Sequence, residues 1–466
     1  RGGSGNFGMA TGKWYFEMTV TSSDFNALLL GVIESTTPPS SGGILSGIGY
    51  YGVDGGKYIN GVKTPYGSAY GTGDIIGIAV DRDGDTVTFY KNNVSQGPID
   101  TSVLSGDLLA QCDNGSSGGS QIFTANFGQK PFAYTPPTGF KTLSTKNLPD
   151  ATVVPSESFG VRLRTGTGVE ATVSDLGFQP DLLWTKTRSN AVNHNLHSTL
   201  MDQNYSFLQT NTTDSEDSTA TTYYMTPTST GYTVGTGDNI NQEDHTFVDW
   251  LWKAGGTGVT NNEGTIESQV SANPKAGFSV VTFTGTGATE TVGHGLGVTP
   301  KLYITKDRTN SSTNWHYHTT QIDGDMDFLF LNTTSASTSS SLSTPSSTVI
   351  TVGGTINTSS ANFVSYVFAD VEGYSKFGSY TGNGSANGTF VFTGFRPRFV
   401  MYKRSNSTGN WLIMDTTRDT YNTMPQFLIP NASNPEASST SSNIDFVSNG
   451  FKLRNSNIDR NGSTNT

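Results

Sequence analysis

The chain has 466 residues, of which 33% are hydrophobic, 11% aromatic and only 14% charged, and 55 are glycine. Domains of about 100 to 150 residues are usual, so this length predicts two to four domains, while the aromatic share argues against a disordered chain. The net charge of −11 argues against nucleic acid as a partner, because binding a phosphate backbone needs clustered Lys and Arg.

Disulfide frameworks and membrane spans are also excluded. Cys112 is the sole cysteine, so an intrachain disulfide and a cysteine-based zinc site are both ruled out. No apolar run approaches the roughly 20 residues of a spanning helix, so membrane insertion is not expected. The chain begins at Arg1 without Met, from which we expect the native N-terminus to lie upstream.

Alternating apolar and polar residues predict strands in the N-terminal part. Residues 13–20 (KWYFEMTV) alternate strictly and predict a half-buried strand. Residues 74–93 (DIIGIAVDRDGDTVTFYKNN) predict a hairpin around the polar turn 81–85. Further short strands are predicted at 27–33, 47–53 and 121–127. Because no amphipathic helix is found, these elements predict a β-sandwich.

Four sequence blocks carry a family resemblance. GKWYFEMTV, GIGYYGVDGGKYINGVKTPYG, GDIIGIAVDRDGDTVTFYKNN and ANFGQKPFAYTPPTGF, in this order, resemble a SPRY domain. The resemblance implies a concanavalin-like, bent sandwich of two antiparallel sheets and a binding or scaffolding role rather than catalysis. The ending FGQKPFAYTPPTGFKTLSTKNLP is similar to SPRY modules in virion proteins of tailed bacteriophages.

The rest of the chain repeats itself three times. The turn TGTG at 165–168 recurs as TGTG at 284–287 and as TGNG at 381–384. Two further motifs recur in the same order. The first is a proline before an alternating strand (QPDLLWTK, TPKLYITK, RPRFVMYK), and the second is a later five-residue motif (FLQTN, FLFLN, FLIPN). The repeat length of about 100 to 120 residues is domain-sized, so each β-rich module is expected to own its core.

These anchors predict the organisation of the chain. The predicted segments are the SPRY-like sandwich at 1–147, a linker at 148–158, module 1 at 159–255, a linker at 256–275, module 2 at 276–373 and module 3 at 374–466. Modules 1 and 2 close on aromatic strands, FVDWLWKAG and FVSYVFADVEG. The equivalent strand of module 3 is expected near residue 461, where the sequence reads NGSTNT. Either the chain is cut or a loop is longer, and we expect the native protein to continue past Thr466.

Tyrosines provide the candidate ligand-binding residues. They are Tyr50, Tyr51, Tyr58, Tyr66 and Tyr70. By the resemblance, this region corresponds to the variable loops that form the ligand surface of SPRY domains. Tyrosine rings stack on sugars or proteins at low entropic cost. The alternative, that several of them fill the sandwich core, stays open because alternation cannot decide it in so glycine-rich a stretch.

No metal site is predicted. The groups closest to one are His316, His318, Asp323, Asp325 and Asp327. The two histidines share one face of a strand and could meet around an axial metal in a trimer, but module 3 has Leu412 and Met414 near that position. Asp323, Asp325 and Asp327, like the aspartates of residues 81–85, are not followed by the distal Glu of an EF-hand. Asp and Gly are common in turns, so a turn explains both groups.

No catalytic residues and no cofactor are predicted either. The sequence has no GxSxG, HExxH or GxxxxGK[ST] motif, and no recurring pair of carboxylates. A polysaccharide-degrading enzyme is therefore the least favoured function.

The repeats, above all YTGNGSANGTFVFTGFRPRFVMYKRSNSTGNWLIMDTTRD, resemble uncharacterised domains that follow SPRY modules in phage tail fibres. The resemblance implies a non-enzymatic virion structural protein, a tail fibre or surface appendage on the virion surface that attaches to host glycan or protein. Its expected partners are other virion proteins and further copies of itself, with a homotrimer favoured. The alternative is a purely architectural component, such as a capsid decoration or tail-shaft protein.

Overall fold

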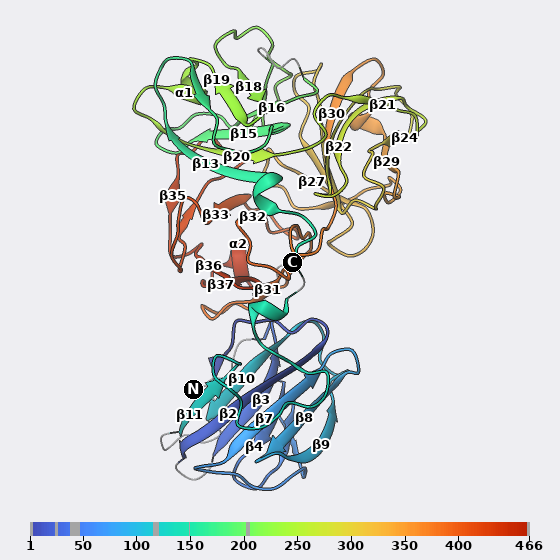
Figure 1. Cartoon of the computed structure of the whole chain (residues 1–466). Helices are drawn as coiled ribbons and strands as arrows, with labels where there is room; N and C mark the ends of the chain where they lie inside the picture. Colours follow the sequence, from blue (N-terminus) through green and yellow to red (C-terminus); the bar gives the residue numbers. More distant parts are fainter. Residues whose placement is uncertain are drawn as a thin grey trace.

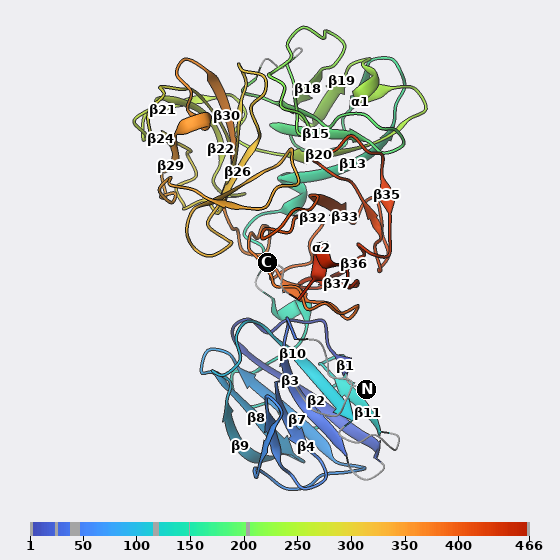
Figure 2. The same ribbon diagram turned by 180° about the vertical axis from the view of Figure 1, so that it is seen from behind.

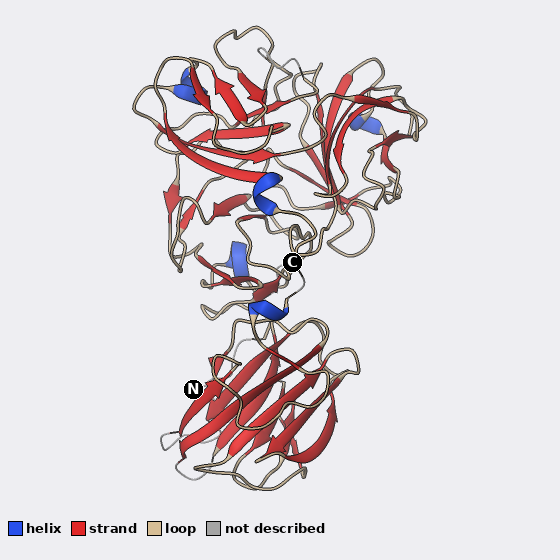
Figure 3. Cartoon of the chain, viewed as in Figure 1, coloured by secondary structure: helices blue, strands red, loops and turns tan. Residues whose placement is uncertain are grey.

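The protein is built almost entirely of β-strands (Figure 3). The computed structural model describes residues 3–23, 27–37, 47–114, 121–148, 150–201 and 206–463. Its helices are single turns: η2 (Thr145–Asn147), η3 (Pro155–Glu157), α1 (Asp238–Asn241), η4 (Gly354–Ile356) and α2 (Ile458–Asn461). In this described part, no helix combines the length and apolar character needed to cross a membrane. The all-β fold class is confirmed.

The N-terminal domain is a sandwich of two antiparallel sheets (Figure 1). The first sheet has the order β1 (Gly3–Ser4), β10 (Leu108–Asn114), β3 (Leu28–Glu34), β4 (Ile48–Tyr51), β5 (Lys57–Ile59) and β6 (Val62–Thr64). The second has the order β11 (Gln121–Asn126), β2 (Lys13–Ser23), β7 (Ile75–Asp81), β8 (Thr86–Lys91) and β9 (Val94–Asp100), with β12 (Lys141–Thr142) parallel to β2. The β7–β8 hairpin is the one that alternation predicts.

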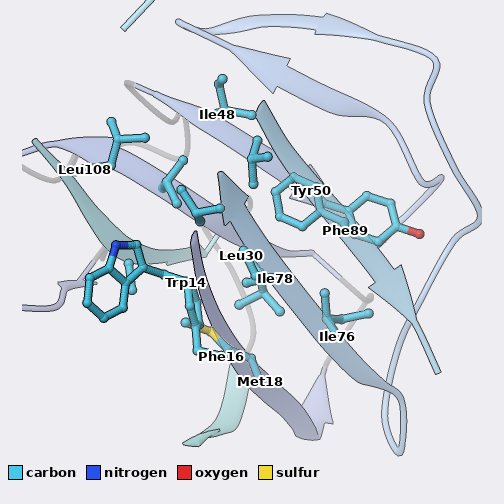
Figure 4. Close-up of a cluster of buried hydrophobic side chains, with 14 of the residues drawn as sticks. Trp14, Phe16, Met18, Leu30, Ile48, Tyr50, Ile76, Ile78, Phe89 and Leu108 are labelled. Carbon is cyan, nitrogen blue, oxygen red and sulfur yellow. The ribbon is translucent and has the colours of Figure 1, made fainter. Parts of the chain in front are cut away.

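Apolar side chains from both sheets meet in the sandwich core (Figure 4). Trp14, Phe16 and Met18 point inward from β2, as predicted. The opposite face of β2 is not half-exposed, however, because Tyr15 and Glu17 are also buried. The Glu17 carboxylate accepts hydrogen bonds from the backbone N–H groups of Ala133 and Tyr134, so the proline-rich segment after β11 covers this face.

Module 1 has a five-stranded and a three-stranded sheet. The five-stranded sheet has the order β13 (Phe159–Thr165), β20 (Thr246–Trp252), β15 (Leu182–Thr187), β16 (Asn195–Ser198) and β17 (Leu208–Gln209). The smaller sheet has the order β14 (Ala171–Val173), β19 (Gly231–Val234) and β18 (Met225–Thr228).

Module 2 keeps this plan and lengthens its main sheet. That sheet has the order β21 (Val259–Asn261), β22 (Ser268–Asn273), β23 (Phe278–Thr284), β30 (Asn362–Phe368), β25 (Leu302–Asp307), β26 (His316–Thr319), β27 (Asp327–Phe330) and β28 (Thr338–Ser339). The smaller sheet pairs β24 (Glu290–Gly293) with β29 (Val349–Val352). The sequence linker 256–275 therefore contributes two strands, β21 and β22, to module 2.

Module 3 forms only small sheets. They are β31 (Phe390–Phe392), β37 (Gly450–Leu453) and β36 (Ile444–Val447); β32 (Phe399–Tyr402) and β33 (Leu412–Asp415); and β34 (Gln426–Phe427) and β35 (Ala437–Ser438). Within the described residues, no strand takes the central place that β20 and β30 hold in modules 1 and 2. The residues 464–466, where part of that strand was expected, lie outside the described ranges.

The three modules do not keep their cores apart. Each has a local apolar cluster, but a further cluster draws residues from all three, with Trp250, Trp315 and Trp411 among its buried members. The expectation that each module owns its core is therefore wrong in part. Apolar residues on both faces of the main strands explain this, because one face covers the local core and the other meets the neighbouring modules.

Equivalent hydrogen bonds join the modules in a cycle. Trp315 Nε1 donates to the Gln209 carbonyl (2.9 Å), and Trp411 Nε1 donates to the Phe330 carbonyl (3.0 Å). His194, at the same position of module 1, places Nε2 3.0 Å from the carbonyl oxygen of Ile429 in module 3. The modules thus form a closed ring with approximate threefold symmetry, seen as three lobes from both sides (Figures 1 and 2).

The sandwich is attached to this ring through module 3 (Figure 2). Asn449 Nδ2 donates to the Gly8 carbonyl (2.9 Å), and the Phe390 N–H donates to the Ser35 carbonyl (3.1 Å). An apolar cluster of Ile33, Leu109, Phe390 and Val447 seals the contact. The end of β3 that carries Ser35 therefore faces the ring.

Candidate functional site

The five candidate tyrosines separate into core and surface residues. Tyr50 and Tyr70 are 0% and 2% exposed and belong to the sandwich core. The Tyr70 hydroxyl donates to the backbone carbonyls of Leu28 (2.7 Å) and Tyr50 (2.8 Å). The ligand-binding prediction is wrong for these two residues, because the alternating strand β4 turns Tyr50 inward and Tyr70 packs against its ring.

Tyr66 has a mixed position. Its ring packs edge-to-face against Tyr50 and Phe89 of the core, and its hydroxyl donates to the Gly97 carbonyl. Burial raises the pKa of Tyr66 to about 12. The side chain thus fixes the segment after β6 onto the sandwich, and only part of its ring reaches the surface.

Tyr51 and Tyr58 are half-buried and, unlike Tyr66, do not pack against the sandwich core. We define the distal patch as Tyr51, Asp54, Tyr58 and Lys63, which come from β4, the following turn, β5 and β6. The two tyrosine rings meet edge-to-face with centroids 5.7 Å apart. The Lys63 Nζ lies 4.9 Å from the centroid of Tyr51 and 6.0 Å from that of Tyr58. An ammonium at this range is attracted by both ring faces.

An ion pair and a tight turn hold the distal patch in place. Lys63 donates to Asp54, which lowers the pKa of the Asp54 carboxyl and raises that of the Lys63 ammonium. The turn that carries Asp54 requires Gly55, whose φ is +75° and where an added Cβ would lie 2.1 Å from the Gly67 carbonyl oxygen. The result is a rigid surface of two rings, one cation and one anion.

The distal patch lies on the strands β4 to β6 at one edge of the first sheet. Tyr51 pairs with Leu29 near the start of β3, and Tyr58 and Lys63 are level with Gly31 in the middle of β3. Ser35, just beyond the other end of β3, contacts module 3, so the patch does not reach that contact. The arrangement can bind a flat or extended ligand by ring stacking, hydrogen bonds and charge.

The histidine and aspartate candidates do not converge on a metal. His316 and His318 stack with centroids 5.8 Å apart on β26, against Phe328. Burial lowers their pKa values to about 4 and about 3, so both are neutral aromatic packing residues. Asp323 accepts the Asp325 N–H (3.0 Å) within a turn. Burial, together with Asp323, raises the pKa of Asp327. In the described ranges, no three His, Cys, Asp or Glu side chains are grouped to hold a metal ion.

Comparisons with known proteins agree on the N-terminal domain. A family model described as the SPRY domain matches residues 13–108. Ran-binding protein 10 of Danio rerio is 32% identical over 132 residues, which are 27% of this chain and 21% of that protein. The chain thus matches about a fifth of that relative's length.

Solved structures of SPRY domains also resemble this part of the chain. The crystal structure of the SPRY domain of human HERC1 is 20% identical, with a TM-score of 0.25, and the match covers 28% of this chain and 84% of that one. A second crystal structure of a human SPRY domain is 16% identical, with a TM-score of 0.23, and covers 28% and 86%. The family model and the two-sheet sandwich together identify the N-terminal domain as a SPRY domain with a concanavalin-like β-sandwich fold.

The three modules are matched as one unit. The model of a domain of unknown function, DUF7483, covers residues 154–466, more than half of the chain. The chain belongs to the DUF7483 family. One family model spans all three modules. This agrees with the closed ring in the structure, because modules that share a core act as one domain.

Sequence reasoning missed the residues that join the modules of the DUF7483 domain. His194, Trp315 and Trp411 stand 17, 17 and 20 residues before the asparagine of the FLxxN-type motif. The backbone N–H of each of these three residues donates to Oδ1 of that asparagine: His194 to Asn211 (2.9 Å), Trp315 to Asn332 (3.0 Å) and Trp411 to Asn431 (2.9 Å). The sequence did contain a signal for these contacts: each module has a residue with a ring N–H group, either His or Trp, 17 to 20 residues before the asparagine of this motif.

Proposed function

We propose that this protein is a non-catalytic binding protein of a tailed-bacteriophage virion, a tail fibre or surface appendage that attaches to host glycan or protein. The single observation that supports this proposal is the position of the distal patch. It combines two half-buried tyrosine rings with a Lys–Asp pair on the strands β4 to β6 of the SPRY domain, away from the contact with the DUF7483 ring.

The physical chemistry of the distal patch fits recognition of a sugar or a peptide. Tyrosine rings offer large apolar faces with a polar rim and lose little side-chain entropy on binding. Lys63 is held over both rings by Asp54, so the surface is ordered before a ligand arrives. Several copies in one appendage would multiply weak contacts through effective concentration.

A binding experiment with a single tyrosine variant tests the proposal. We expect the 466-residue protein to bind whole bacterial cells, or glycans extracted from their envelopes, saturably and with host restriction. Tyr58→Ala is expected to weaken this binding roughly tenfold or more, as truncation of a central aromatic residue does in other interfaces. Binding is measured by flow cytometry of the labelled protein and by biolayer interferometry on immobilised glycan.

Tyr421→Ala is the matched control, because Tyr421 is 83% exposed and lies in module 3 rather than in the distal patch. It is expected to leave binding unchanged. If the folded protein binds none of the cells and glycans but joins purified virion proteins, the architectural alternative replaces the adhesive one. Release of reducing sugar from the glycans would contradict the non-catalytic proposal.

A further inference from the structure

A cleft lies where the linker before module 1, the end of module 1 and the first strands of module 2 meet. It consists of two adjoining hollows of about 480 Å³ and about 260 Å³, and Ala272 lines both of them. Ligand sites commonly lie between structural units, and the larger hollow alone has the roughly 300 to 1,000 Å³ usual for such sites. We call the two hollows together the junction cleft, and its lining comes from residues 152–158, 253–261 and 270–275 and from Gly295.

Hydrogen bonds hold the walls of the junction cleft together. The Lys253 N–H donates to the Ser158 carbonyl (2.9 Å), which ties the linker to the end of module 1. Asn273 Nδ2 donates to the Lys253 carbonyl (3.3 Å), and the Gly255 N–H donates to Ser271 Oγ (2.9 Å), so the end of module 1 is tied to β22. The cleft is therefore formed before a ligand arrives, which lowers the entropic cost of binding.

The smaller hollow combines an apolar lining with neutral polar groups. Val270 and Ala272 of β22 line it, together with Val259 of β21, which is 69% exposed. Gly295 keeps this space open, because its φ is +70° and an added Cβ would lie 2.9 Å from Val270 Cγ1 and 3.2 Å from the Ala272 Cβ. Hydroxyl and amide groups line the same hollow, from Thr257, Thr260 and Asn261.

All the charged groups of the junction cleft belong to the larger hollow. They are the ammonium groups of Lys253 and Lys275 and the carboxylate of Glu157. Within the described ranges, neither ammonium has an ion-pair or hydrogen-bond partner, although Lys253 is half-buried. Two unpaired amines on one hollow attract an anionic group, even in a protein with a net charge of −11. The Glu157 carboxylate accepts hydrogen bonds from hydroxyl groups.

This division of chemistry fits one class of ligand, a sugar chain that carries a carboxylate. A pyranose ring has an apolar C–H face and a rim of hydroxyl groups, which match the lining of the smaller hollow. A carboxylate on the neighbouring sugar unit would meet Lys253 and Lys275 in the larger hollow. A wholly apolar ligand would instead leave the hydroxyl, amide and charged groups of the cleft without partners, which costs free energy.

We propose that the junction cleft is a binding site for a short acidic oligosaccharide, with one sugar ring in the smaller hollow and a carboxylate of the next unit between Lys253 and Lys275. Glu157 and the hydroxyl and amide groups of the lining bind the sugar hydroxyls. This site is separate from the distal patch, because it belongs to the linker and the ring and not to the SPRY sandwich. The inference therefore does not depend on the adhesive function proposed for the patch.

Two acidic oligosaccharides test the proposal on the 466-residue protein. The probes are trigalacturonate and a hyaluronan tetrasaccharide, with neutral maltotriose and the peptide triglutamate for comparison. By isothermal titration calorimetry we expect saturable binding of at least one acidic sugar, weakened by added salt. Hydrogen exchange is expected to slow in residues 253–261 and 270–275. The double variant Lys253→Gln, Lys275→Gln is expected to bind that sugar at least about tenfold more weakly, because both cations are lost.

The matched control is the double variant Lys130→Gln, Lys141→Gln, which removes two exposed lysines of the SPRY domain and should bind as the parent does. The proposal is wrong if the folded protein binds neither acidic sugar, if the Lys253 and Lys275 variant binds as tightly as the parent, or if maltotriose binds equally well. Equal binding of triglutamate would replace the sugar with an acidic peptide. Binding that survives Tyr58→Ala supports the junction cleft, whereas its loss would place the sugar at the distal patch.

Discussion

A single buried asparagine closes the glycine turn that opens each module. Asn241, Asn357 and Asn461 are 1% exposed or less. In each, Oδ1 accepts the backbone N–H of the third residue of the TGxG turn, and Nδ2 donates to carbonyl oxygens around that turn. The turn is thus pinned by a side chain that stands 73 to 80 residues later in the sequence. This explains why the turn recurs in all three modules.

Asn357→Ala is expected to destabilise the protein by about 1 to 3 kcal/mol. The change removes the hydrogen bonds that the buried Asn357 side chain makes with the Thr286 N–H and the Ala288 carbonyl, and each such bond contributes about 0.5 to 1.5 kcal/mol. Urea unfolding followed by tryptophan fluorescence measures the effect. The exposed Asn434→Ala is the control and is expected to change stability by less than about 0.5 kcal/mol. Equal midpoints for both variants would contradict the closing role of Asn357.

Each of the equivalent strands β15, β25 and β32 has a lysine at its end. Lys186 and Lys306 are the second-last residues of β15 and β25, and Lys403 directly follows β32. Lys306 Nζ donates to the Thr213 carbonyl of module 1 (3.0 Å), and Lys403 Nζ to the Thr334 carbonyl of module 2 (3.1 Å). Lys186 donates to carbonyls of its own module, near Glu436 of module 3. Burial lowers the pKa of each ammonium to about 8. These strands therefore bring a buried amine to each junction.

The stability of the protein is expected to rise between pH 8 and 10. In this window the unfolded chain keeps Lys306 protonated, at its ordinary pKa of 10.5, whereas the folded chain releases the proton near its pKa of about 8. Because the unfolded state then binds more protons, the free energy of unfolding increases with pH, by about 2 kcal/mol for one such lysine across the window.

Lys306→Met tests this sign. The variant removes one buried amine, so the rise in urea midpoint between pH 8 and 10 should become smaller than in the parent protein. Lys301 directly precedes β25 and is only half-buried, so Lys301→Met is the control and should keep the parent's slope. The expected direction would be wrong if the parent protein lost stability between pH 8 and 10 and Lys306→Met abolished this loss.

At the scale of the whole molecule, the SPRY sandwich has a core of its own, whereas the three modules of the attached ring share a common core. Ion pairs support the ring: Arg188 donates to Glu436 (2.7 Å) between modules 1 and 3, and Arg308 pairs with Glu216 between modules 2 and 1. Arg418 joins the first pair from within module 3 (2.9 Å). The partners of the two pairs between modules lie 248 and 92 residues apart in sequence, so the ring is held by contacts between modules.

An isolated module is therefore not expected to fold as the SPRY domain does. Residues 276–373 alone would expose Ile304, Trp315 and Tyr366, which face the shared core. Residues 1–147 keep a complete core and should unfold cooperatively, with a sharp near-ultraviolet circular dichroism signal. The module alone should lack that signal and bind a hydrophobic dye. A cooperative, dye-free module 2 would show that the shared core is dispensable.

The candidate site could be predicted only in outline. The sequence located the tyrosine cluster, but Tyr50 and Tyr70 proved to be core residues, whereas Tyr51 and Tyr58 are half-buried at the surface. Alternation along one short strand cannot assign these faces when glycines interrupt it. The position of Lys63 over the two rings depends on the pairing of β5 with β6, and so on strand register.

The sequence by itself determined the all-β class, the SPRY domain and the threefold repeat. These features rest on short-range periodicity and on motifs that recur in order, so they need no knowledge of packing. Only the tertiary structure decided that the modules share a core and that His194, Trp315 and Trp411 link them. Those features depend on contacts between residues about 80 to 240 positions apart, which local patterns do not encode.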